Sequence, residues 1–88
     1  MKTAIESLRQ PELVIVRRLR NGPLTEFELT REIVIHSGYE EADAACRISK
    51  WLDDLQRKGL VWSGFLFNCS GQSILAAALT FRGRELVG

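Results

Sequence analysis

Apolar residues recur at helical spacing in the first part of the chain. Leu13, Val16 and Leu19 lie on one face, a proline occupies the first helical position, and an Asn-Gly-Pro sequence ends the periodicity. The pattern predicts a helix over about residues 11–20, with a turn before it at residues 4–9.

A second apolar stretch follows a helix-start signal. Thr25 and Glu28 form a Thr-x-x-Glu capping box, in which each side chain can satisfy a free backbone amide of the first turn. This predicts a helix over about residues 26–35, with Phe27, Leu29 and Ile33 as its buried residues.

The third apolar stretch is the longest. Ser37 and Glu40 match a second capping box, and Gly59 stands where a helix needs a left-handed cap, so we expect a helix over about residues 38–58. On a helical wheel, the predicted inward face comprises Ala44, Ala45, Ile48, Trp51, Leu52 and Leu55. The predicted outward face comprises Asp43, Cys46, Arg47, Lys50, Asp54 and Arg57.

Beyond Gly59 the pattern changes to that of strands. Two stretches rich in β-forming residues, at about 60–67 and 73–81, flank an Asn-Cys-Ser-Gly-Gln sequence that suits a hairpin tip. Three consecutive alanines at 76–78 form strands poorly, so a helix is the competing prediction there. Helices followed by a hairpin indicate an α+β fold.

Three short phrases of this chain resemble those of a known family. They are Gly-Pro-Leu-Thr-x-x-Glu-Leu ending at Leu29, the helix end Leu-x-x-x-Gly-Leu-Val around Gly59, and Leu-Thr-x-x-Gly-Arg ending at Arg84. The chain resembles the winged helix-turn-helix domains of small regulators of the MarR, PadR and ArsR type. The resemblance implies one domain over residues 1–88, with a three-helix core and a two-stranded β-hairpin wing. It also implies a homodimeric, sequence-specific regulator of double-stranded DNA. The segment between the second and third helices is longer than the usual turn of that family.

Composition excludes several other classes of protein. With 45% hydrophobic and 26% charged residues, the 88-residue chain matches an ordinary soluble protein, and no apolar run has the length of a membrane span or of a signal peptide core. We expect a cytoplasmic protein. No catalytic or phosphate-binding motif occurs, so we expect neither an enzyme nor a bound cofactor. Cys46 and Cys69 are interpreted as buried, reduced thiols, and His36 as a loop or capping residue, with no metal site.

The charge pattern only partly supports DNA binding. The net charge is +1, residues 37–46 carry three acidic side chains and no basic one, and residues 60–81 carry no charge. Duplex binders gain most of their affinity by neutralising phosphates with Lys and Arg. The residues expected to contact DNA are Ser37, Tyr39, Arg47, Lys50, Arg82 and Arg84.

A second hypothesis keeps the fold and changes the partner. Trp62 and Trp51 are interpreted as core residues, yet a strand bearing Trp62, Phe65 and Phe67 has more apolar surface than a small domain covers easily. The alternative is therefore a protein-binding adaptor, or a phage- or mobile-element-encoded antagonist that inhibits a host protein complex without binding DNA. Stacking of single-stranded nucleic acid on the same aromatic residues is weaker, because no basic groove accompanies them.

Overall fold

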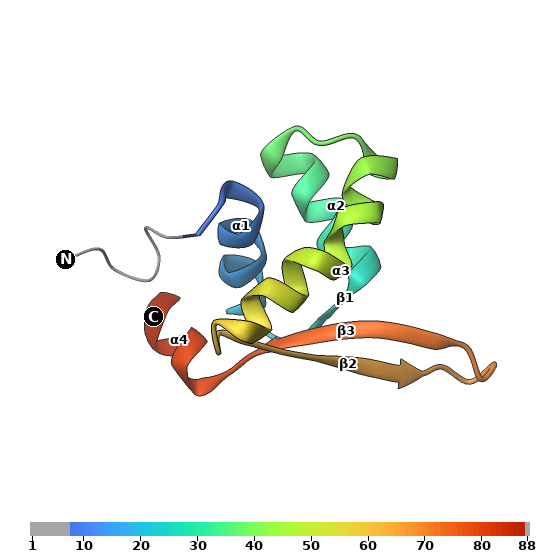
Figure 1. Ribbon diagram of the computed structural model, residues 1–88. Coiled ribbons are helices and arrows are strands. Elements are labelled where there is room, and N and C mark those ends of the chain that lie inside the picture. The colour runs from blue at the N-terminus through green and yellow to red at the C-terminus, as the bar shows by residue number, and fades with distance from the viewer. Residues whose placement is uncertain (1–7, 88) are drawn as a thin grey trace.

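The computed structural model describes residues 8–87 as four helices and three strands (Figure 1). Their order is α1 (Gln10–Leu19), β1 (Leu24–Thr25), α2 (Glu26–Ser37), α3 (Glu41–Arg57), β2 (Val61–Phe67), β3 (Ser73–Leu79) and α4 (Phe81–Val87). Helices α1, α2 and α3 group on one side of the β2–β3 hairpin, whose tip extends beyond them. The expected turn at 4–9 falls mainly outside the described residues.

Helix α2 begins as the sequence predicts. The backbone amide of Glu28 donates to Thr25 Oγ1 at 3.3 Å, and the amide of Thr25 donates to Glu28 Oε1 at 3.1 Å, which confirms the capping box. The helix continues two residues past the predicted end and stops at Gly38, which adopts a left-handed conformation with φ 73°. Glycine takes that conformation without the steric penalty of a Cβ atom.

The predicted start of the third helix was wrong. Ser37 is the last residue of α2, so it cannot cap the next helix, and α3 begins at Glu41 after a Glu40 that makes no side-chain cap. The far end of α3 agrees with the prediction. Gly59 has φ 77°, and the amide of Leu60 donates to the carbonyl of Leu55 at 3.0 Å, as in a left-handed helix cap.

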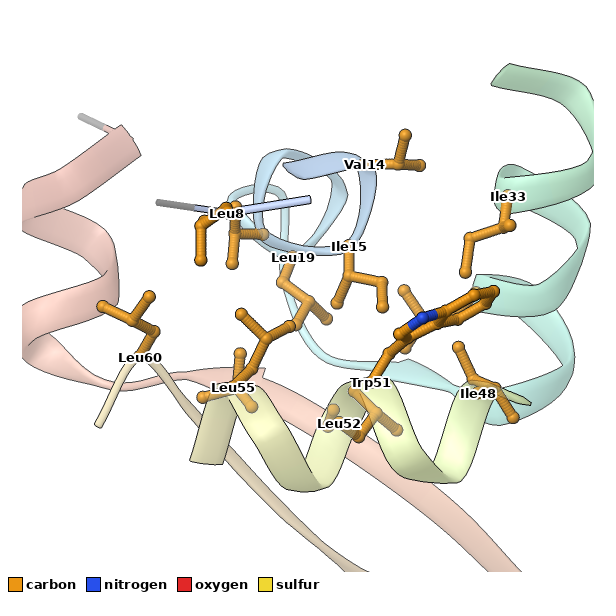
Figure 2. Packing of buried hydrophobic residues seen from close by; sticks show 14 of the residues in the cluster. Leu8, Val14, Ile15, Leu19, Ile33, Ile48, Trp51, Leu52, Leu55 and Leu60 are labelled. Atoms are coloured by element: carbon orange, nitrogen blue, oxygen red, sulfur yellow. The ribbon is translucent and has the colours of Figure 1, made fainter. Parts of the chain in front are cut away.

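A single apolar core lies between α1, α2, α3 and the base of the hairpin (Figure 2). The predicted burial of Ile48, Leu52 and Leu55 is confirmed, and these residues belong to one cluster with Ile15, Val16, Leu19, Leu29 and Ile33. Trp51 is 4% exposed, and its ring meets that of Tyr39 edge to face at a centroid distance of 5.2 Å. An aromatic pair with this geometry adds roughly 0.5–1.5 kcal/mol beyond area burial.

Three predicted core residues are exposed. Phe27 lies two positions before Leu29, about 200° around α2, so it points away when Leu29 points inward. Ala45 lies about 100° from the buried Ala44 and also faces solvent. Trp62 is 56% exposed because its neighbour Val61 takes the inward position of the strand.

The sheet contains three strands in the order β1-β3-β2, all antiparallel, where the sequence predicted two. The added strand β1 pairs Leu24 with Ala77 and Thr25 with Ala76. The alanines at 76–78 are therefore strand residues and the competing helix prediction was wrong. Small side chains suit this central strand, where Ala76 and Ala77 are buried between two neighbours.

The predicted second strand ends at Leu79 rather than 81 because Thr80 starts α4. The amide of Gly83 donates to Thr80 Oγ1 at 3.0 Å, and that hydroxyl donates to the carbonyl of Gly59 at 2.6 Å. The amide of Thr80 also donates to the carbonyl of Leu60 at 3.1 Å. Two of the three phrases that carry the family resemblance thus meet at one junction between α3 and α4.

Gly83 is buried at this junction. A Cβ atom there would lie closer than 3.0 Å to the carbonyl oxygen of Leu60, and 3.0 Å from Leu79 Cδ2. Only glycine lets α4 approach the backbone of residue 60 this closely.

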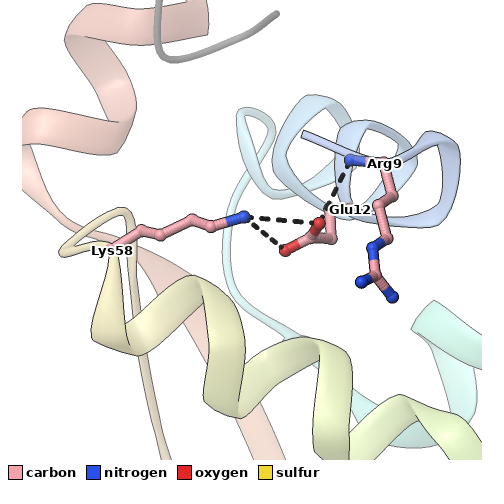
Figure 3. A network of polar contacts seen from close by, with 3 residues as sticks. All are labelled: Arg9, Glu12 and Lys58. Atoms are coloured by element: carbon pink, nitrogen blue, oxygen red, sulfur yellow. Dashed lines mark hydrogen bonds and ion pairs between the residues drawn. The ribbon is translucent and has the colours of Figure 1, made fainter. Parts of the chain in front are cut away.

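A buried ion pair ties α1 to the residue that follows α3 (Figure 3). Glu12 is 2% exposed and accepts hydrogen bonds from Lys58 Nζ at 3.1 Å and from the Arg9 amide at 3.1 Å. The carboxylate therefore caps α1 and fixes the C-terminal end of α3 with the same two oxygens.

Candidate nucleic-acid interface

Arg47, the central candidate for DNA contact, already has an acidic partner. Its Nε lies 2.7 Å from Asp43 Oδ1 one helical turn earlier, and both side chains are exposed. The hydrogen bond and the charge of Asp43 raise the pKa of Arg47 above its usual value. The guanidinium is thus positioned at the surface of α3, but Asp43 offsets its charge.

Lys50 lies one turn further along the same helix and is exposed. Within residues 8–87 it forms no ion pair, in contrast to Arg47 and to Arg57, which pairs with Asp53 at 3.0 Å. Lys50 is therefore the uncompensated positive charge on the outward face of α3.

Ser37 and Tyr39 are placed less favourably for contact with phosphate. Ser37 Oγ is buried, without a hydrogen-bond partner in the described part of the chain, so this hydroxyl is not presented to solvent. Tyr39 is half-buried, with its ring against Trp51. Both side chains are thus packed against the protein where α2 meets α3, and neither is positioned to reach a phosphate.

Arg82 and Arg84 lie on α4, the helix that follows the uncharged hairpin. Both are exposed and neither forms an ion pair in the described part of the chain. Two further arginines, Arg17 of α1 and Arg20 directly after it, line a shallow pocket together with Leu86 and Val87 at the end of α4. The third arginine at the end of α1, Arg18, pairs instead with Glu32 of α2.

The hairpin presents apolar surface. Phe65 and Phe67 are 67% and 75% exposed, and the exposed Trp62 lies over Gly64, where a Cβ atom would be 2.8 Å from the ring. The sequence prediction of leftover apolar surface on this strand therefore agrees with the structure.

The sequence analysis missed a second apolar surface between α2 and α3. A groove there is lined by Phe27, Thr30, Arg31, Val34, Ile35, Glu41 and Ala45. Phe27 and Ile35 are 65% and 62% exposed. Their separation by eight residues, which places them on one side of a helix, was the available signal.

The two thiols were predicted to be buried, and this was wrong. Cys46 lies on the outward face of α3 and Cys69 in the hairpin tip, and both are free and exposed. His36 belongs to the last turn of α2, with Nε2 3.8 Å from Glu32 Oε1. Among residues 8–87 no group of His, Cys, Asp and Glu has the arrangement of a metal site. None of the helices in this range has the length and apolar content that a bilayer crossing requires.

The arrangement of helices and strands is similar to that of a solved protein. The crystal structure of putative transcriptional regulator TA0346 from Thermoplasma acidophilum superposes with a TM-score of 0.73 and 22% sequence identity, covering 88% of this chain and 72% of that one. At this identity the similarity shows a shared fold. No protein-family model matches the chain, and no curated protein matches its sequence.

Proposed function

We propose that the chain is a single winged-helix domain that acts in the cytoplasm as a homodimeric, DNA-binding transcription regulator. The fold that it shares with a protein described as a transcriptional regulator supports this class. The observation that carries DNA binding is the exposed Lys50, which forms no ion pair with any residue that the structure describes, on the outward face of α3, the second helix of the α2–α3 pair. That position corresponds to the recognition helix of helix-turn-helix proteins.

In this proposal α3 enters the major groove. Lys50 contacts a phosphate or a base edge, and Arg47 reaches DNA by exchanging its bond to Asp43 for one to a phosphate. Arg82 and Arg84 contact the backbone from α4. Tyr39 contributes by packing against Trp51 of α3 or through its backbone amide, whereas the buried hydroxyl of Ser37 makes no contact with DNA.

Lys50 gives a cleaner test than Arg47, because replacing Arg47 also releases the charge of Asp43. We expect Lys50→Gln to weaken binding of a fluorescein-labelled mixed-sequence duplex at roughly 50 mM salt and to lower the salt slope by about one phosphate contact per subunit. Arg20→Gln is the matched control, since Arg20 is exposed, forms no ion pair within residues 8–87 and lies at the end of α1 rather than on α3. Fluorescence anisotropy over a salt series measures both quantities.

A wild-type chain that binds no duplex at that salt concentration, where electrostatic attraction is strong, contradicts the DNA proposal. Equal losses in Lys50→Gln and Arg20→Gln contradict the role of α3 as the contact helix.

One observation favours a protein partner instead. The hairpin carries no charge and exposes three aromatic side chains, and the α2–α3 groove adds Phe27 and Ile35 beside the acidic Glu41. A protein-binding adaptor, or an antagonist of a host complex, uses such surfaces. Phe67→Ala then abolishes capture of the partner while Lys50→Gln leaves it unchanged, the reverse of the pattern expected for DNA binding.

A further inference from the structure

Strand β2 lies at one edge of the sheet, and the hydrogen-bond pattern shows which of its backbone groups are not bonded to β3. The residue pairs Leu60–Thr80 and Asn68–Gln72 are hydrogen-bonded at the two ends of the β2–β3 ladder. Bonded and non-bonded pairs alternate along an antiparallel ladder, so the even-numbered residues of β2 bond to β3. The amides and carbonyls of Ser63, Phe65 and Phe67 therefore point away from β3, along the open edge of the sheet.

This edge lacks the usual protection against pairing. Natural edge strands carry charges, prolines or bulges that prevent another strand from adding to them. From Val61 to Phe67 the strand has none of these, and its register with β3 runs without interruption. Figure 1 shows the outer half of the hairpin extending past the helices, so no helix in the described chain covers the edge there, while at its inner end Ser63 Oγ donates to Gln56 Oε1 of α3 at 2.5 Å.

We propose that the β2 edges of two copies of the chain pair antiparallel about a two-fold axis, joining two three-stranded sheets into one. A two-fold axis through Phe65 pairs Ser63 of each copy with Phe67 of the other and satisfies all three sets of free backbone groups. This inference does not depend on DNA binding; it names the surface through which the copies associate.

The lack of charged side chains along the β2 edge favours a second copy of the chain as the partner that pairs with it. Residues 60–81 have no charged side chain, so two copies meet at this edge without repulsion. The strand also offers no charged group that would select a different, oppositely charged partner.

The available area fits a modest dimer. Trp62, Phe65 and Phe67 are 56%, 67% and 75% exposed, and Leu66 is 54% exposed. If each of these large side chains presents roughly 200 Å² when fully exposed, the four together expose about 500 Å², and pairing along the edge covers the part that faces the other copy. A standard interface buries about 800 Å² per partner, and the paired backbone accounts for part of the remainder. We expect a dimer that dissociates on dilution.

The test compares two changes at one position. Phe65→Pro removes an outward amide without removing a bond to β3, and proline is tolerated at such edge positions. Phe65→Ala removes the aromatic ring but keeps the amide. By sedimentation equilibrium we expect a wild-type dimer, a weaker dimer for Phe65→Ala, and a dissociation constant raised at least about tenfold further for Phe65→Pro. Far-UV circular dichroism and the urea midpoint check that each variant folds.

Amide hydrogen exchange on the wild-type chain tests the pairing without any substitution. The amides of Ser63, Phe65 and Phe67 should become protected as protein concentration rises, whereas those of Trp62, Gly64 and Leu66 should be protected at every concentration. A wild-type monomer at several hundred micromolar overturns the proposal, as does a dimer in which the odd-numbered amides exchange freely. A mass that grows past the dimer overturns the two-fold arrangement, because head-to-tail pairing of edges does not close.

Discussion

The junction between β3 and α4 makes a sharp prediction for Gly83→Ala. The new Cβ atom would overlap the carbonyl oxygen of Leu60, a backbone atom that also accepts the amide of Thr80 at 3.1 Å. Relief of the overlap therefore requires α4 to move, which strains the hydrogen bonds of Thr80 to Gly59 and Gly83.

The size of the effect follows from opposing contributions. Overpacking of this kind costs about 1–3 kcal/mol, and each weakened hydrogen bond adds about 0.5–1.5 kcal/mol. The better helix propensity of alanine returns about 0.5–1 kcal/mol. We expect a net loss of about 1–5 kcal/mol in the free energy of unfolding and a fall in Tm of at least roughly 5 °C for a domain of this size.

Gly64→Ala is the matched control. Its Cβ atom would also meet a neighbour at 2.8 Å, but that neighbour is the ring of Trp62, which is 56% exposed and can rotate away. Since alanine is also less costly than glycine in a strand, we expect a change within about 1 kcal/mol. Urea denaturation followed by circular dichroism measures both variants. If Gly83→Ala unfolds at the wild-type midpoint, or if both variants lose equal stability, the close approach of α4 to residue 60 is refuted.

Three further changes test the core, the cap and the buried ion pair. Leu52→Ala should cost about 2–5 kcal/mol in urea unfolding because the side chain is 1% exposed, and a surface-like loss below 0.5 kcal/mol contradicts its placement. Thr80→Val should cost about 0.5–2 kcal/mol through loss of the helix cap, and an unchanged thermal midpoint would count against that role. Lys58→Met leaves the Glu12 carboxylate buried without its cation and should cost about 1–3 kcal/mol, less than for a fully buried pair because Lys58 is 39% exposed. The double variant with Glu12→Gln should recover part of that loss, and additive losses would show that the two side chains act independently.

Local signals in the sequence predicted much of the fold correctly. The capping box of Thr25 and the left-handed cap at Gly59 each depend on residues within one helical turn, so the sequence displays them directly. Ser37 shows the limit of such signals. It matched a capping box, yet the adjacent Gly38 could equally end the preceding helix, and the structure takes that second option.

Features that depend on distant contacts were not predictable. Helix α4 contains Gly83, and glycine lowers the helix propensity of this segment. The reason for a glycine there is the close approach of the Leu60 backbone, which the sequence does not display. Strand β1 has two residues and exists through its pairing with β3. For the candidate site, the sequence identified exposed basic residues on the third helix, but not that Asp43 binds Arg47 while Lys50 has no acidic partner within residues 8–87. Spacing of four residues permits such a pair without requiring it.

The junction of Gly59, Thr80 and Gly83 also affects which substitutions these three positions tolerate. Thr80 links the two glycines, because its hydroxyl donates to the carbonyl of Gly59 and accepts the amide of Gly83, which lies against residue 60. The effect of a substitution at one of these positions should therefore depend on which residues occupy the others. In a saturation scan read out by cellular abundance, we expect the half-buried Thr80 to be as intolerant as a core residue, and a first substitution at any of the three to relax selection on the other two.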